Sequence, residues 1–599
     1  MAVHREKRQI ALFSQRRDPQ KVSEFRKPRQ TNAVVYRGAE DYHVDATDAA
    51  DKPPLERQTI LMANYLRNNA WNNGGDFTNL DLLWYAKGVG AMMSRALNDP
   101  ASWWFYAAIH GEYVTPANSQ PAFPGWKFIK SPPAVPTAPL PAKAAQDLYW
   151  NQCQHQSWYF LPWHRGYLLA LEAQLRQDIV SLGGPASWAL PYWNYFGGTN
   201  GSQYQMPPAF AAKKLPDGTP NPLFIIMRYG PDGNGNIFIP TAAGEAAHPG
   251  NPNFSRGQVN ANAMSNDLYT GSDRVTKPPG FGGPETGFAH GGGTSGNWEN
   301  NPHNLVHVYV GYYGAATAPL YGLMSDPGTA ALDPIFYLHH SNIDRMWALW
   351  NANGNANPTK STWLNGPTTR KFVMPGTGGQ PWYYTPDQMK DLAKLNYTYQ
   401  ELKTSPAPLA ALPKRLALLG AKDAAAEAKK APAPPAKPKV TELLGASDVP
   451  LRIAGRVSRA SVKLDASVRR KTVKSLAMVA KTASPDNVYL KVENVRGTFD
   501  AAVLSVYVNL PEEANLRESG QYRVGSVALF GLRRASMKDG QHAGEGLTFI
   551  LDATPVIDEL HLKNEFDVES LGVSVIPSGP LPEKADITVG RISVYREGF

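Results

Sequence analysis

Hydrophobic positions along this chain change their spacing towards the C-terminus. Between residues 56 and 403, apolar residues recur at helical spacing, and long runs rich in glycine, proline and asparagine separate the helical stretches. From residue 448 to residue 599, short segments alternate apolar and polar residues between turn signals, as the strands of a sandwich do. The pattern predicts a mainly α core with long loops, followed by a C-terminal antiparallel β-sandwich.

A stretch rich in alanine, proline and lysine separates these two regions. Residues 404–447 have the composition of a partly helical, partly extended linker. Residues 1–55 form an N-terminal arm, either wrapped on the core or disordered. We therefore expect four parts: an arm at 1–55, a core at 56–403, a linker at 404–447 and a β-domain at 448–599.

The charge distribution, the cysteine content and the lack of long apolar runs limit which partners and which cellular location we expect. The formal net charge is +9, but the basic excess lies in the arm and around the linker, and no nucleic-acid recognition motif accompanies it. One cysteine excludes an internal disulfide. No apolar run is long enough to span a membrane, and no export signal is visible, so we expect a cytoplasmic protein that binds neither nucleic acid nor membrane.

Histidines occupy four short helical stretches of the core, which we expect to form a four-helix bundle. In WWFYAAIHG, His110 shares a helix face with Trp103 and Tyr106. In FLPWHRGYLLALE, His164 begins an apolar stripe, and His155 lies nine residues earlier, before the helix. A histidine that only packs in the core is the alternative, above all for His110.

The other two stretches carry closer pairs. In NPHNLVH, Asn301 is a candidate cap, and His303 and His307 lie one helical turn apart, so both imidazoles can bind one ion. In DPIFYLHHSNIDRMW, His340 and His339 point about 100° apart on a helix. We assign His340 as a ligand and His339 as a packing residue behind it.

Six imidazoles in two groups of three favour copper or zinc, because no thiolate pair or carboxylate triad accompanies them. A zinc hydrolase is the rival. Its HExxH pattern is absent, since Asn304, Leu305 and Val306 separate His303 from His307.

The segments IHG, FLPWHRGYLLALE, PHNLVH and DPIFYLHHSNIDRMW are similar to those of the tyrosinase, catechol oxidase and polyphenol oxidase family. The motif YTY at 397–399 resembles the paired-tyrosine signature that ends the oxidase core in this family. The resemblance implies two copper ions, with O2 as co-substrate, small phenols as substrates, o-quinones as products and a role in melanin-type pigment formation. It also implies the ligands: His110, His155 and His164 for CuA, and His303, His307 and His340 for CuB.

Further residues take roles from the same resemblance. Cys153 is expected to form a thioether bond to His155, the alternative being a buried free thiol. Glu299 and Asn304 match positions that hold a base-like water, which predicts monophenol hydroxylation as well as catechol oxidation. Their alternative is helix capping, with Glu299 and Asn301 at a helix start. Asp344 is expected to brace its helix by pairing with a basic residue, or else to be ordinary surface charge.

The C-terminal segments LSVYVNLP, VGSVALFGLRR, GVSVIP and ITVGRISVY resemble the β-domain of plant-type polyphenol oxidases, which covers the copper pocket and places an apolar side chain in it. The sequence does not identify that side chain. The alternative is a β-domain that only stabilises or oligomerises the core. The loop 324–328 carries no bulky aromatic residue, so access to the site is expected to be open unless the β-domain intervenes.

Two other functions remain open from the sequence: a catechol or o-aminophenol oxidase without monophenolase activity, and an oxygen carrier of the hemocyanin kind. A homo-oligomer is possible, and the partner that delivers copper is unknown.

Overall fold

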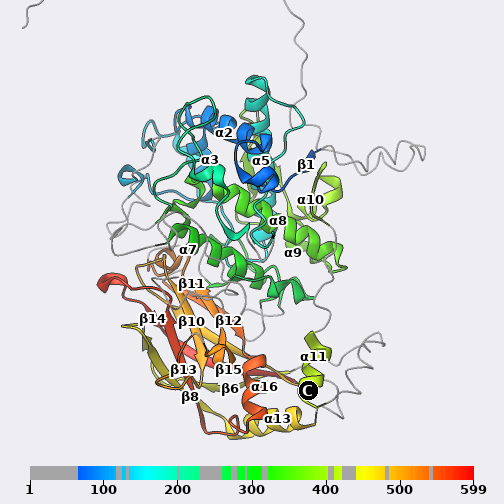
Figure 1. The fold of residues 1–599 in the computed structure, drawn as a ribbon, viewed down its shortest axis with the longest axis vertical. Helices are drawn as coiled ribbons and strands as arrows, with labels where there is room; N and C mark the ends of the chain where they lie inside the picture. Colours follow the sequence, from blue (N-terminus) through cyan, green and yellow to red (C-terminus); the bar gives the residue numbers. More distant parts are fainter. Residues whose placement is uncertain are drawn as a thin grey trace, which may run out of the picture.

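The structure is a computed structural model, and it describes residues 65–115, 125–129, 134–198, 203–228, 259–271, 279–290, 293–312, 322–402, 411–420, 440–478, 485–516, 518–538 and 544–598. The expected N-terminal arm at 1–55 lies outside these residues. Figure 1 shows a helical core and a β-rich C-terminal domain that contact each other beside helix α7.

The core is built around two long helices, α5 (Phe160–Ser181) and α8 (Ile335–Ala352), both buried along most of their length. Helix α2 (Leu80–Met93) packs on α5 where Gly88 leaves no room for a larger residue beside Leu175. The remaining helices of the core are α3 (Trp103–His110), α4 (Lys143–Tyr149), α6 (Pro208–Ala211), α7 (Leu305–Gly311), α9 (Ser361–Leu364) and α10 (Pro386–Met389). Side chains at three helix starts, Asn79, Ser102 and Thr385, accept backbone N–H groups as caps.

One sequence expectation about the core is wrong. Helix α7 begins at Leu305, so His303 lies before it, in a π-helical turn at Glu299–Asn304. Asn301 has an extended backbone inside this turn (φ −145°, ψ 115°), and its side-chain oxygen accepts the N–H of Asn260 from another segment. A tertiary contact therefore replaces the cap that the local sequence predicts.

Two small sheets close the core. Strand β1 (Tyr65–Arg67) pairs in parallel with β5 (Tyr397–Tyr399), which joins segments more than 300 residues apart in the sequence. Strands β3 (Phe372–Pro375) and β4 (Pro381–Tyr384) form a hairpin whose Tyr384 ring packs against Gly166 of α5.

The β-domain is organised on one sheet of nine strands, in the order β11-β10-β13-β8-β6-β15-β9-β12-β2. Its own strands are β6 (Val440–Ala446), β8 (Ser458–Leu464), β9 (Asn487–Val495), β10 (Val503–Val508), β11 (Arg523–Ala528), β12 (Leu547–Asp552), β13 (Ser570–Pro577) and β15 (Arg591–Gly598), with the pair β7 (Leu451–Arg452) and β14 (Thr588–Val589) beside it. Neighbouring strands within the domain are antiparallel, as predicted. The sheet curls so that Gly525 of β11 approaches Leu551 of β12. The expected sandwich is thus one sheet folded over.

The ninth strand comes from the core. Strand β2 (Gly293–Thr294) pairs in parallel with Leu547 and Thr548 of β12. Because β2 precedes the turn that carries Glu299 and His303, the outer edge of the C-terminal sheet is bonded directly to the segment that leads into this turn.

The predicted C-terminal boundary of the linker differs from the one in the structure. Strand β6 begins at Val440, inside the range 404–447, so the β-domain starts earlier than expected. Helix α11 (Ala411–Leu418) lies in the same range and docks on the β-domain: Leu416 is fully buried, and Arg415 binds Asp558 of α16 (Thr554–Leu562) at 2.6 Å. The rest of the domain's helices are α13 (Ala466–Ala477) and α15 (Leu532–Ala535).

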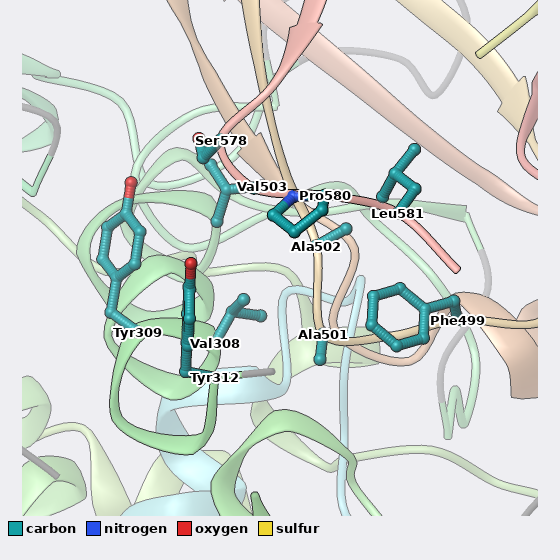
Figure 2. Close-up of a pocket in the computed structure, with 11 residues that line it drawn as sticks. Val308, Tyr309, Tyr312, Phe499, Ala501, Ala502, Val503, Ser578, Pro580 and Leu581 are labelled. Atoms are coloured by element: carbon teal, nitrogen blue, oxygen red, sulfur yellow. The ribbon is translucent and has the colours of Figure 1, made fainter. Parts of the chain in front are cut away.

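A small pocket marks the contact between the two domains. Figure 2 shows Tyr309 of α7 and Tyr312 just after it on one side, and Val503, Pro580 and Phe499 of the β-domain on the other. Within the described residues, no helix combines the length and the apolar character that crossing a bilayer requires.

Candidate dicopper centre

The second histidine trio converges on one point. The Nε2 atom of His340, on α8, lies 3.2 Å from that of His303 and 3.3 Å from that of His307. All three side chains are buried. Two nitrogens bound to one ion at about 2.0 Å with tetrahedral angles are about 3.3 Å apart, so this spacing suits a single metal ion.

The first trio is more open than the second, because the compact group within 4.8 Å consists of His110, Cys153 and His155 and does not include His164. The Nε2 atoms of His110, at the end of α3, and His155, before α5, are 3.3 Å apart. The ring of His164 lies 5.7 Å and 5.4 Å from theirs, between centroids, and its Nε2 atom has no hydrogen-bond partner among the described residues. The rings of His164 and His340 stack at 4.3 Å, so the two trios lie side by side.

The outer nitrogens fix the orientation of five rings. Four Nδ1 atoms lie at hydrogen-bond distance from an acceptor that has no proton to give: the carbonyls of Pro327 for His110, Phe160 for His164 and Met324 for His307, and the Asn304 amide oxygen for His303. Nδ1 of His155 lies at the same kind of distance from the carboxyl group of Glu299. These distances are 2.8–3.1 Å. In the first four rings Nδ1 therefore carries the hydrogen, and Nε2 presents a lone pair to the centre.

These lone pairs require a cation. Burial lowers the pKa of all six histidines, that of His110 to about 3, so protons do not occupy the space between them. Converging unprotonated imidazoles in a buried site match the preference of copper or zinc. The residues present thus fit two metal ions.

His339 lies beside the second trio. Its ring stacks on that of His303 at 5.3 Å and is tilted against that of Tyr195 at 5.7 Å, between centroids. One of its ring nitrogens lies within 4.8 Å of the ligand atoms of the second trio, so distance alone does not separate it from the ligands, and its role as a packing residue stays a prediction. The shorter Nε2 contacts belong to His340.

Cys153 is buried beside the first trio. Its sulfur lies within 4.8 Å of ligand nitrogens of His110 and His155, and burial raises its pKa. The sulfur is also 3.0 Å from Nδ1 of His290, which donates to the Cys153 carbonyl at 2.8 Å. Arg534 of the β-domain donates to the other nitrogen of His290. A thioether to His155 stays a prediction.

Glu299 and Asn304 each touch one trio. Besides His155, the Glu299 carboxylate accepts the backbone N–H of Gln156 with both oxygens, at 2.9 and 3.0 Å, and burial raises its pKa to about 8. Asn304 directs its oxygen to His303 and its amide towards Ser295 at 3.4 Å. Neither residue serves as a helix cap here.

Asp344 is the centre of a buried network, not surface charge. It accepts hydrogen bonds from Arg165 (2.5 Å), Tyr397 (2.6 Å) and Tyr399 (2.5 Å), and Arg67 lies 3.4 Å away. Burial alone would raise the pKa of Asp344, but the two arginines outweigh it and hold that pKa below its ordinary value. The network joins α8 to α5 and to the β1–β5 pair, and so fixes the helices that carry His164 and His340.

Phe530 of the β-domain covers the centre. Its ring lies 4.3 Å from His307, 5.5 Å from His155 and 5.8 Å from His303, between centroids, and the side chain is buried. It therefore contacts ligands of both trios on the face that they leave open. The following residue, Gly531, has φ +81°, a conformation that favours glycine and turns the chain into α15.

Known proteins share these features. The common central domain of tyrosinase matches residues 100–353, and a domain of unknown function (DUF7868) matches residues 440–597. Tyrosinase HcTyr1 of Hahella sp. (strain CCB-MM4) is 30% identical over 530 residues, which cover 86% of this chain and 97% of that protein. The chain belongs to the tyrosinase family. It is a copper-dependent oxidoreductase acting on phenols with O2, and its buried histidine groups can hold two copper sites.

More distant relatives share the fold. The (+)-larreatricin hydroxylase of Larrea tridentata is 28% identical over 53% of this chain and 46% of its own length. The structure of latent apple tyrosinase superposes with a TM-score of 0.51 at 19% identity, covering 89% of this chain and 97% of that one. Latent aurone synthase gives 0.53 at 19% identity, over 89% of this chain and 90% of its own. Both therefore support a helical core followed by a β-rich domain.

Sequence reasoning missed Phe530, His290, Arg533 and Arg534. The segment VGSVALFGLRR predicts a strand and resembles part of a pocket-covering β-domain, but the sequence does not identify which of its side chains reaches the pocket. A glycine after a phenylalanine at a strand end signals a turn. Nothing local indicates that this turn reaches a copper site more than 200 residues earlier in the chain.

Replacing Asp344 with alanine is expected to lower the free energy of unfolding of the core by about 3–5 kcal/mol, because buried Arg165 loses its counter-charge, whereas Arg67 keeps Glu172. Urea unfolding followed by tryptophan fluorescence measures this. Asp387→Ala, which removes an exposed partner of Lys390, is the control and should cost at most about 1 kcal/mol. Equal losses in the two variants would show that the network does not brace the core.

Proposed function

We propose that this protein hydroxylates monophenols at the ortho position, oxidises the resulting o-diphenols to o-quinones, and is latent as the intact chain. The observation that carries the proposal is the Phe530 ring, packed on ligands of both trios where a phenol ring would have to approach. The two copper ions, when bound, supply the redox chemistry that activates O2.

Glu299 and Asn304 support the hydroxylase activity. A phenol has a pKa of about 10, so it needs help to lose its proton at neutral pH. Glu299 is a buried carboxylate fixed by the N–H of Gln156, and Asn304 adds an amide beside the other trio. We infer that the pair accepts this proton through a water molecule. Catechols depend less on such a base, because they already carry both hydroxyl groups and only have to give up two electrons and two protons to become o-quinones.

Replacing Glu299 with glutamine is expected to reduce monophenol hydroxylation about 100-fold while changing catechol oxidation much less, because a general base contributes about 10²–10⁴-fold. Rates with a monophenol and its catechol are compared in an activated form. Glu285→Gln, the same change at an exposed site paired with Lys360, should alter neither rate.

Two outcomes contradict the role of Glu299. An unchanged ratio of the two rates means that Glu299 is not the base. An equal fall in both rates means that Glu299 acts only by holding His155. If the parent protein shows no monophenol hydroxylation at all, it is a catechol or o-aminophenol oxidase.

Latency is supported by the position of the β-domain as well as by Phe530. The domain shares strand pairing with the core through β2 and clasps the linker helix α11. Two relatives of similar fold, the apple tyrosinase and the aurone synthase, are described as latent.

Replacing Phe530 with alanine in the intact chain is expected to raise catechol oxidation at least about tenfold, because the pocket no longer has to be vacated before substrate binds. Phe499→Ala is the matched control: it truncates the same residue type at the domain contact, in a pocket that no histidine lines (Figure 2). A similar gain in both variants would assign latency to loosened docking. If Phe530→Ala binds O2 but oxidises no phenol, the protein is an oxygen carrier.

The position of a chain cut should also matter. A protease site introduced within 404–410 leaves α11 on the β-domain, whereas one within 421–439 leaves α11 covalently on the core and still docked through Arg415 and Leu416. We expect the first cut to release the β-domain and raise catechol oxidation faster. Gel filtration measures release, and Arg415→Met should remove the difference. Equal release from both cuts would show that α11 is not a clasp.

A further inference from the structure

The loop 324–328 orients one imidazole of each trio. The carbonyl of Met324 accepts from Nδ1 of His307 at 2.8 Å, and the carbonyl of Pro327 accepts from Nδ1 of His110 at 2.9 Å. These two carbonyls are three residues apart, so the conformation of one short loop determines the aim of a ligand at each copper site.

Asp326 lies between these two carbonyls and holds the loop in shape. One of its carboxylate oxygens accepts the N–H of Gly328 at 2.7 Å, and its own carbonyl accepts the N–H of Ala330 at 2.9 Å. The side chain is 1% exposed. A buried carboxylate needs a counter-charge to remain ionised, and nothing in the loop's own sequence, Met-Ser-Asp-Pro-Gly, supplies one.

The counter-charge comes from the β-domain. Arg533 of α15 donates to the second oxygen of Asp326 at 2.9 Å, and its own backbone N–H donates to Asp500 at 3.0 Å. The guanidinium lies 4.7 Å from the ring of Tyr113, which follows α3. Arg533 is thus fixed from the domain side and reaches across the domain contact to the loop.

The same turn carries the ring that fills the pocket. Phe530 is three residues before Arg533, and a side-chain atom added at Gly531 would touch Pro327 at 3.4 Å. The turn 530–533 therefore lies directly on the loop 324–328.

We propose that Asp326 and Arg533 are positioning residues for the copper centre: through their ion pair, the docked β-domain holds the loop 324–328 so that His110 and His307 keep their aim. This inference rests on the proposed docking of the domain on a loaded copper site. It gives the domain a second task, retention of copper, which is separate from exclusion of phenols by Phe530.

The test compares copper release from the full-length, copper-loaded protein to an excess of a copper chelator. Arg533→Met and Asp326→Asn are each expected to release copper about 10- to 100-fold faster, the range found when a residue that orients a metal ligand is changed. The double variant should release it no faster than Arg533→Met alone, because that change already removes the contact with Asp326 together with the ion pair to Asp500.

Three controls separate positioning from access and from unfolding. Phe530→Ala opens the pocket but keeps the ion pair, so its copper release should match the parent while its catechol oxidation rises. Arg469→Met removes an ion pair with Asp567 elsewhere in the β-domain and should change neither. Thermal unfolding of the copper-free proteins shows whether each variant folds. If Arg533→Met does not fold, the test is carried by Asp326→Asn, which keeps the shape of the side chain.

The inference is overturned if Arg533→Met and Asp326→Asn release copper at the parent rate, or if Phe530→Ala releases it as fast as they do, since access would then be the cause. A parent protein that binds fewer than two copper ions, or that oxidises no phenol after the cut within 404–410, contradicts the proposed function instead. Failure of this inference and failure of the proposed function are therefore distinguished by measuring the copper content and the phenol oxidation of the parent protein.

Discussion

Six buried imidazoles must stay neutral and must aim their Nε2 lone pairs at common points, and this constraint organises the whole core. Burial keeps the rings neutral, because desolvation disfavours the protonated form. The aim of a ring is fixed by the group that meets its Nδ1 atom, and the core supplies such a group for five of the six rings, from different sources; Nδ1 of His340 has no hydrogen-bond partner among the described residues. His164 uses its own helix through Phe160, His303 uses its neighbour Asn304, and His155 uses Glu299. His110 and His307 both depend on the loop 324–328, so a change in this one loop would disturb a ring in each trio.

The local sequence was sufficient to predict those parts of the site whose position depends on helix geometry alone. Helical spacing placed His110, His164 and His340 on buried helix faces, and family resemblance grouped all six histidines before any coordinates were considered. Local sequence failed where a distant segment overrides it. The helix predicted from Asn301 starts later because Asn301 bonds Asn260 instead. Asp344 was recognised as a brace, but its partners Arg67 and Tyr399 are contributed by strands that pair across more than 300 residues.

The covering residue was beyond sequence analysis for the same reason. Phe530 has no local property that separates it from Phe499 or Phe549, since all three are apolar residues of the β-domain. Its role follows from the way the domain docks, with β2 of the core added to the edge of its sheet and α15 seated on the loop 324–328. Such contacts form only when two folded domains pack together. The periodicity of apolar residues in the sequence indicates only which face of a helix or strand is buried.

The geometry of the turn 530–533 links substrate access to metal support. The backbone at Gly531 directs the phenylalanine ring towards the trios, and within three residues the arginine side chain reaches Asp326. A rigid turn of this length cannot withdraw the ring by a large distance while keeping the ion pair intact. Opening for a phenol by movement of the domain therefore also removes the counter-charge from the loop that aims His110 and His307. On the two proposals made above, the docked state is the one in which the centre is both inaccessible to substrate and best held, so latency and copper retention would be two results of one contact.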